Sequence, residues 1–204
     1  MKKTIFHALH TDAGAKMVSF AGFEMPIQYP TGIIEEHRTV RSGVGVFDVS
    51  HMGRFFIRGA NALPFLQHAL SNNAAALDVG LGQYTMLPNE TGGVYDDAYL
   101  YRFVEDEFLL VVNAANREKD WDHLQAVREN FPHTEMVDRT LEVAMLSLQG
   151  PGAREVMEAA TQSELPDPMR NELGVVDIGG ANVFLARTGY TGEPICFELF
   201  IERD

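Results

Sequence analysis

Short apolar runs, separated by glycine- and proline-rich turns, recur along this chain and limit what it can fold into. Eighteen glycines and nine prolines interrupt its 204 residues. Runs of this kind between tight turns indicate strands joined as hairpins. Single helical segments separate groups of strands rather than following every strand. The pattern predicts an α+β fold, with antiparallel-rich sheets and flanking helices, rather than a doubly wound parallel sheet.

Periodicity and turn residues place the expected elements. Helices are predicted over 33–42, 61–70, 116–130 and 152–160, with Thr31 and Asn116 as caps of the first and third. Strands are predicted over 44–49, 54–58, 80–87, 94–104, 107–113, 135–139, 143–149, 175–178, 181–187 and 195–202. Pro26 and Pro30 interrupt the first thirty residues, which are expected to form an ordered but irregular arm. Residues 161–174 are expected to form a loop, and 60–140 a self-contained βαβ-like unit.

The acidic composition excludes several classes of partner. Sixteen basic residues against twenty-nine acidic ones give a formal charge of −13. Binding of bulk nucleic acid needs a basic stripe, and docking on an anionic membrane needs basic clusters, so neither is expected. No apolar run approaches the length of a membrane-spanning helix, and no secretory leader is recognisable, which favours a cytoplasmic protein. The single cysteine, Cys196, excludes an internal disulfide framework.

Familiar nucleotide and nucleophile motifs are missing from the sequence. It contains no phosphate-binding loop of the G-x-x-x-x-G-K-[ST] type, no G-x-G-x-x-G fingerprint and no G-x-S-x-G elbow. Its seven histidines are scattered without a ligand pattern, so no metal site is predicted.

Two neighbouring acids lie in a predicted strand, where aspartate is disfavoured. Strand alternation places Asp97, Tyr99 and Tyr101 on one face and Asp96 on the other. A solvated strand start after the Gly92–Gly93 turn would explain the pair. A carboxylate held beside aromatic faces, where it can accept a proton or orient an amine, is the functional alternative.

Glu198 lies inside the apolar run Ile-Cys-Phe-Glu-Leu-Phe-Ile. A buried charge there needs either an ion-pair partner, for which Arg187 is the candidate, or a ligand with adjacent N–H donors. Asn113 ends another apolar strand and could either cap a turn or hydrogen-bond a heterocycle. These groups suit a flat, amide-like heterocycle better than a phosphate ester.

Five segments in order carry a family resemblance: GAKMVSFAGFEMPIQYPTGIIEEHRTVRSGVGVFDVSHMG, QYTMLPNETGGVYDDAYLYR, LLVVNAANREKD, LQGPGA and ARTGYTGE. With them, the chain resembles the T-protein of the glycine cleavage system, a tetrahydrofolate-dependent aminomethyltransferase. The resemblance implies transfer of a methylene from the aminomethylated lipoyl arm of the H-protein to tetrahydrofolate. Ammonia leaves and the arm remains as dihydrolipoyl.

The resemblance also implies roles for individual residues. Asp97 matches the functional acid of the family, and Glu198 matches the carboxylate that holds the pterin ring. The positions that match the lining of the folate cavity are Met52, Tyr84, Tyr101, Asn113 and Tyr190. Arg187 is a candidate for a supporting role.

The family fold has three small domains, the second inserted into the first. The resemblance therefore predicts a first folate-binding subdomain from residues 1–59 and 141–204, and an inserted subdomain from 60–140. The rest of the first domain and a C-terminal barrel-like domain are expected to be absent from this sequence, so weak tetrahydrofolate binding and poor turnover are predicted for it alone. One extra residue near Ile195 and Cys196 departs from the family pattern and bears on the position of Glu198.

Two other functions share the fold implied by the resemblance. One is a folate-dependent demethylase that accepts a different one-carbon donor. The other is a non-catalytic folate-binding module. The Asp-Asp pair and the Asn-Ala-Ala-Asn segment favour the aminomethyltransferase.

Overall fold

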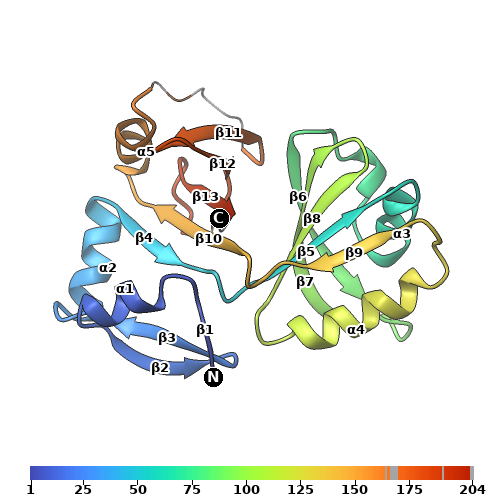
Figure 1. The fold of residues 1–204 in the computed structure, drawn as a ribbon, viewed down its shortest axis with the longest axis horizontal. Coiled ribbons are helices and arrows are strands. Elements are labelled where there is room, and N and C mark those ends of the chain that lie inside the picture. Colours follow the sequence, from blue (N-terminus) through green and yellow to red (C-terminus); the bar gives the residue numbers. More distant parts are fainter. Residues whose placement is uncertain (164, 166–169, 190, 203–204) are drawn as a thin grey trace. The chain divides into compact units, whose positions relative to one another are not determined.

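Two compact units make up the structure, a computed structural model that describes residues 1–163, 165, 170–189 and 191–202. Unit 1 comprises Met1–His51 and Leu141–Asp204, and unit 2 comprises Met52–Thr140 (Figure 1). Unit 2 is therefore continuous in sequence and interrupts unit 1. Residues 52–59, which the sequence analysis grouped with the first subdomain, lie in unit 2 because β5 (Gly53–Arg58) pairs there with two strands of the same unit.

The first thirty residues of unit 1 form a small sheet, so the prediction of an irregular arm was wrong. The sheet has the order β1-β3-β2, with β1 (Lys2–Lys3), β2 (Lys16–Phe20) and β3 (Phe23–Gln28). Proline is disfavoured in a central strand because it has no backbone N–H to donate to a neighbouring strand. Strand β1 pairs only with Phe23 and Glu24, so Pro26 has a strand neighbour on one side alone. The short partner strand is what makes proline tolerable there.

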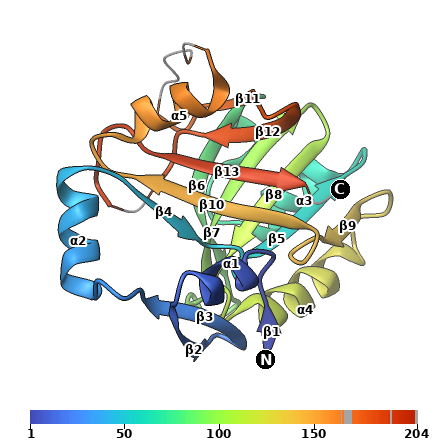
Figure 2. The same cartoon turned by 60° about the vertical axis from the view of Figure 1, so that its left-hand side comes forward.

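A five-stranded antiparallel sheet forms the larger part of unit 1, in the order β11-β12-β13-β10-β4. Figure 2 shows β13 between β10 and β12. Its strands are β4 (Gly45–Asp48), β10 (Val143–Gln149), β11 (Leu173–Ile178), β12 (Ala181–Ala186) and β13 (Phe197–Glu202). All five strands were predicted within a few residues, because alternating apolar runs and the Gly179–Gly180 turn mark them. Strand β11 begins inside the segment predicted as a loop.

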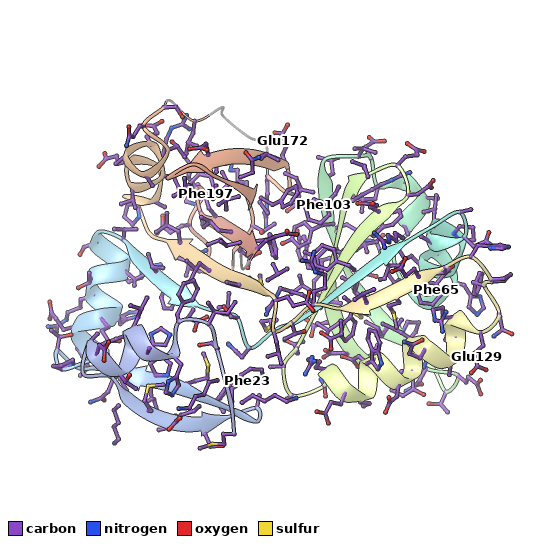
Figure 3. The ribbon with its side chains drawn as sticks, in the orientation of Figure 1. Phe23, Phe65, Phe103, Glu129, Glu172 and Phe197 are labelled. Atoms are coloured by element: carbon purple, nitrogen blue, oxygen red, sulfur yellow. The ribbon has the colours of Figure 1, made fainter. Side chains whose placement is uncertain are left out.

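The helices of unit 1 are α1 (His7–Asp12), α2 (Ile33–Ser42) and α5 (Ala153–Thr161). The predicted cap of α2 was wrong: Gly32, at φ 85°, occupies that position rather than Thr31. Gly150 leads from β10 into α5 at φ 119°, and a Cβ there would lie 2.4 Å from the carbonyl oxygen of Gly43. Only glycine permits this approach. The core beneath α5 includes Met157, Leu148 and Phe197, the last labelled in Figure 3.

Unit 2 is a five-stranded sheet in the order β6-β7-β8-β5-β9, and every pairing in it is antiparallel. Besides β5, its elements are α3 (Ala62–Ala69), a 3₁₀ turn (Ala74–Ala76), β6 (Leu81–Pro88), β7 (Val94–Val104), β8 (Glu107–Val112), α4 (Arg117–Arg128) and β9 (Glu135–Asp138). Strands β8 and β9, which α4 connects, run in the same direction on either side of β5. The predicted βαβ-like unit is therefore a split one, with an antiparallel strand between its two parallel strands.

Helices α3 and α4 pack on one face of this sheet and enclose the core of unit 2 (Figure 1). Phe65 of α3, labelled in Figure 3, is fully buried. Phe55 of β5 and Leu124 of α4 belong to the same core cluster. Alternate residues of each strand face these helices, as the period of a strand requires. None of the helices formed by the described residues is long and apolar enough to cross a membrane.

A buried polar network in unit 1 joins the N-terminal sheet region to β4. His10 Nε2 donates to Asp48 Oδ2 at 2.9 Å, while His10 Nδ1 lies 2.8 Å from the hydroxyl of Tyr29. The backbone N–H of Ser50 donates to Asp48 Oδ1 at 2.9 Å. Burial raises the pKa of Asp48, but hydrogen bonds from Ser50, Thr4 and His10 outweigh it and hold that pKa below its usual range.

This network predicts acid-sensitive stability in unit 1. Because the pKa of Asp48 is lower folded than unfolded, its contribution is present above about pH 4 and disappears as the pH falls through the folded pKa. Asp48→Asn is expected to cost about 1.5–3 kcal/mol at pH 7, as for a hydrogen-bonded charge, and less at pH 3. Amide hydrogen exchange of Met145, whose N–H bonds to Ser50 Oγ, reports on this region.

Asp12→Asn supplies the matched control, since Asp12 is exposed on α1. It should leave the exchange rate of Met145 unchanged at both pH values. An equal loss from Asp48→Asn at pH 3 and pH 7 would contradict a role for the ionised carboxylate.

Candidate functional site

Asp96 and Asp97 occupy opposite faces of β7, as strand alternation predicts. Asp96 faces the helices and is 6% exposed, and Ala98 and Leu100 follow it into the core of unit 2. Asp97 is exposed on the other face. The pair is therefore more than a solvated strand start, because one of its members is a buried carboxylate.

Two hydrogen-bond donors hold the carboxylate of Asp97. The hydroxyl of Tyr84, on β6, donates to Asp97 Oδ2 at 3.0 Å, and Asn113 Nδ2 donates to Asp97 Oδ1 at 2.7 Å. The hydrogen bond to Asp97 raises the pKa of Tyr84, so this hydroxyl remains a donor at neutral pH. Three predicted site residues thus meet on one face of the unit 2 sheet, and the carboxylate remains open to a ligand.

Asp96 anchors Asn113 from the other side of the strand. It accepts hydrogen bonds from the backbone N–H of Asn113 at 3.0 Å, from Asn113 Nδ2 at 3.0 Å and from Asn116 Nδ2 at 2.7 Å. Asn116 occupies the N-cap position of α4, but its side chain makes no capping hydrogen bond. Asn116 therefore occupies the predicted cap position but does not cap the helix, because its side-chain amide donates to Asp96 instead.

A tyrosine surface extends from Asp97 along the same face of β7. The rings of Tyr99 and Tyr101 lie 5.1 Å apart, and Tyr101 is fully buried. A Cβ on Gly82 of β6 would lie 2.7 Å from Tyr101 Cδ1, so a glycine is needed for the ring to cover that strand. Met52, at the start of unit 2, is partly buried, and its carbonyl accepts from Arg54.

Glu198 belongs to a buried polar cluster of unit 1, on β13. Its side chain is 2% exposed, and the hydroxyl of Thr188 donates to Glu198 Oε2. Ser147 on β10 is its partner in the strand register. Gln149 Nε2 donates to Ser147 Oγ at 2.9 Å, and Thr191 Oγ1 donates to Gln149 Oε1 at 2.7 Å. The described hydrogen bonds of this cluster come from neutral side chains, and the one from Thr188 reaches the carboxylate.

The remaining predicted site residues of unit 1 have different outcomes. Arg187 Nη2 donates to the carbonyl of Pro194 at 2.9 Å, which ties the ends of the Gly-containing loop together. Cys196 is buried, and burial and the nearby Glu198 charge raise its thiol pKa. Strand β13 starts at Phe197, so Ile195 and Cys196 precede the strand. Tyr190 lies outside the described residues.

Several polar residues of these clusters were not singled out by sequence reasoning. They are Asp120, Ser147, Gln149 and Thr188, all buried. The sequence does contain a pattern that indicates one of these positions. Asn116, Asp120 and Leu124 are spaced four residues apart, so the first two share the face of α4 on which Leu124 is buried. No comparable periodicity marks Thr188, which contacts Glu198 through the return of the loop.

Each cluster has a definite chemical capacity. In unit 2, an exposed carboxylate beside tyrosine rings can stabilise a positive charge on a nitrogen or accept its proton. In unit 1, a carboxylate can accept adjacent N–H groups of a heterocycle. Among the described residues, no group of three His, Cys, Asp or Glu side chains could hold a metal ion.

Sequence comparison connects this chain to known proteins. The family model of the GCVT N-terminal domain matches residues 6–204. The chain is 52% identical over 201 residues to an aminomethyltransferase of Thermus thermophilus, covering 98% of this chain and 57% of that protein. It is 47% identical over 202 residues to an aminomethyltransferase of Deinococcus deserti, covering 99% of this chain and 56% of the relative. The chain therefore spans about half the length of the curated relatives it matches.

Solved structures agree on the fold. The glycine cleavage system aminomethyltransferase T from Bartonella henselae matches with a TM-score of 0.88 and 36% identity, covering 98% of this chain and 54% of that one. A heterotetrameric sarcosine oxidase from Corynebacterium matches with a TM-score of 0.56 and 16% identity, over 83% of this chain and 82% of that one, which indicates a similar fold alone. The match over nearly the whole sequence shows that this chain belongs to the GCVT N-terminal domain family.

Proposed function

We propose that this chain is the folate-binding portion of an aminomethyltransferase of the glycine cleavage system. The reaction moves the methylene of an aminomethylated lipoyl arm, carried by the H-protein, to tetrahydrofolate and releases ammonia. Tetrahydrofolate, when bound, supplies the nitrogen that takes up the one-carbon unit. The observation that carries the proposal is the exposed carboxylate of Asp97, which Tyr84 and Asn113 hold by hydrogen bonds. The names of the relatives support the same reaction.

The proposed role of Asp97 is electrostatic. A negative charge beside a nitrogen that becomes cationic stabilises the transition state, provided that the charge is already oriented. The two donors fix the carboxylate plane and leave its exposed side for the substrate. Tyr84 and the partly buried Tyr99 offer apolar faces for a flat ring, and the buried ring of Tyr101 contacts that of Tyr99.

The proposed role of Glu198 is recognition of the pterin ring. Its burial and the hydrogen bond from Thr188 orient the carboxylate, and a carboxylate can accept two adjacent N–H donors from a heterocycle. Roles in folate binding for Met52, Asn113 and Tyr190, and a supporting role for Arg187, are part of the same proposal. The cytoplasm is the proposed compartment.

Calorimetric titration of the 204-residue chain with tetrahydrofolate tests this recognition. Binding is expected, and Glu198→Gln should weaken it by about 10- to 150-fold, because a charge-assisted hydrogen bond contributes about 1.5–3 kcal/mol. Glu202→Gln is the matched control, since Glu202 ends the same strand in an exposed position. Wild-type affinity in Glu198→Gln would remove this residue from the ligand site.

A further inference from the structure

Asp120 is a buried carboxyl group that the proposed reaction does not use. It lies on α4, is 0% exposed and follows Asn116 by one helical turn. No N–H or O–H of the described part of the chain lies within hydrogen-bond distance of either carboxyl oxygen. An ionised carboxylate in such a position would be costly, because nothing would replace its lost hydration.

The group that faces Asp120 is the carboxylate of Asp96, on β7. Asn116, one turn before Asp120, donates to Asp96 Oδ1 at 2.7 Å, which brings the two carboxyl groups together. Two carboxylates can form a hydrogen bond only if one of them carries a proton. Asp96 already accepts three N–H donors from Asn113 and Asn116, so both of its oxygens serve as acceptors. The proton therefore belongs on Asp120, which becomes the fourth donor to Asp96.

The surroundings of Asp120 agree with this assignment. Burial and the facing charge of Asp96 raise the pKa of Asp120 to about 8, and Lys119 lowers it only in part. The ammonium of Lys119 is directed to the carbonyl of Tyr95 and to Asn116 Oδ1. Two histidines on these elements make ring contacts: His123 of α4 with Tyr95 of β7, and His68 of α3 with Phe131.

We propose that Asp120 is a positioning residue, which as a neutral carboxylic acid donates a hydrogen bond to Asp96 and thereby fixes the acceptor that orients Asn113. Asn113 in turn donates to Asp97 at 2.7 Å. The chain of contacts thus runs from the buried face of the sheet to its exposed face. Only its last link, from Asp97 to a substrate, rests on the proposed function.

Carbon NMR of the full 204-residue chain labelled at aspartate carboxyl carbons tests the position of the proton. One aspartate should titrate near pH 8 in the wild type and in Asp122→Asn, and this titration should be missing from Asp120→Asn. Asp122 is the matched control because it is exposed on the same helix. Titration of every aspartate below pH 5 would overturn the proposal.

The stability of unit 2 gives a second readout of the same proton. The native state holds it up to about pH 8, whereas the unfolded state releases it near pH 3.8. Between these two pH values, the unfolding equilibrium constant of the wild type should therefore rise about tenfold per pH unit relative to that of Asp120→Asn. The wild type thus becomes less stable than the variant as the pH rises. Fluorescence of Trp121, the single tryptophan, reports urea unfolding of this helix. A difference that stays constant with pH would contradict the proposal.

The positioning role is tested by the side-chain amide resonances of Asn113 and Asn116. In the wild type they should shift with the midpoint of Asp120, since its ionisation removes a donor from Asp96 and adds a like charge. In Asp120→Asn the amide replaces the lost donor at every pH, so both resonances should stay constant. Persistence of the pH-dependent shift in Asp120→Asn would overturn the positioning role.

Tetrahydrofolate titration at pH 7 and pH 9 separates this inference from the proposed function. Wild-type affinity should weaken at pH 9, whereas Asp120→Asn should retain its affinity. If no variant binds tetrahydrofolate, the proposed function fails, and the resonances of Asn113 and Asn116 still decide the role of Asp120. If binding occurs but weakens equally in both proteins, the positioning role is wrong and the proposed function stands.

Discussion

Asp97→Asn is expected to slow aminomethyl transfer by about 10²- to 10⁴-fold, the range for loss of a positioned acid–base or charge-stabilising group. Binding of tetrahydrofolate should be unchanged. The asparagine oxygen can still accept from Asn113, and its amide can donate to the hydroxyl of Tyr84, so the local geometry is kept. The variant therefore removes only the charge. Ammonia release from an aminomethylated lipoyl carrier, in a chain of the relatives' length, measures the rate.

Asp122→Asn is the control for this experiment, because it removes one negative charge from an exposed position in the same unit. It should react at the wild-type rate. Equal activity of Asp97→Asn and wild type would reject the assigned role of Asp97. Activity of the wild type with an N-methylated amine in place of the lipoyl carrier would instead favour the folate-dependent demethylase.

Local signals explain which elements of the fold could be predicted. The hairpin of β6 and β7 has apolar alternation on both sides of a Gly-containing turn, and both strands were predicted within one residue. The N-terminal sheet was missed because Pro26 argues against a strand. That argument fails where β1 is only two residues long and leaves one side of β3 without a strand partner. The length of the strand that pairs with β3 depends on tertiary structure, and no local sequence pattern indicates it.

The candidate site shows the same limit. Strand alternation separated Asp97 from Asp96 and placed the tyrosines beside Asp97, which the structure confirms. It could not show that Asp96 accepts from Asn113 and Asn116, because these residues come from a different strand and helix. Sequence reasoning offered Arg187 as a candidate ion-pair partner of Glu198, and it gave no sign of the hydrogen bond from Thr188.

Arg54→Met is expected to cost unit 2 about 3–5 kcal/mol of unfolding free energy, the range for leaving buried polar groups unpaired together with lost packing. Arg54 lies on β5 and is fully buried. Its guanidinium donates to the carbonyl of Met52 and to that of Thr140, and its backbone N–H donates to Thr140 Oγ1. Met52 and Thr140 are the first and last residues of unit 2. One side chain therefore closes the unit at the point where the chain enters and leaves it.

Methionine keeps the apolar stem of Arg54 but donates no hydrogen bond, so both carbonyls lose a donor. Arg54→Lys should be intermediate, because a single ammonium lacks the planar fork that reaches two acceptors. Arg58→Met, on the same strand, removes an exposed ion pair with Glu135 and should leave the stability close to that of the wild type. Urea unfolding followed by Trp121 fluorescence compares the three. If Arg54→Met were as stable as Arg58→Met, the closure would come from the strand pairing of β5 with β8 and β9 alone, and the buried guanidinium would be dispensable to it.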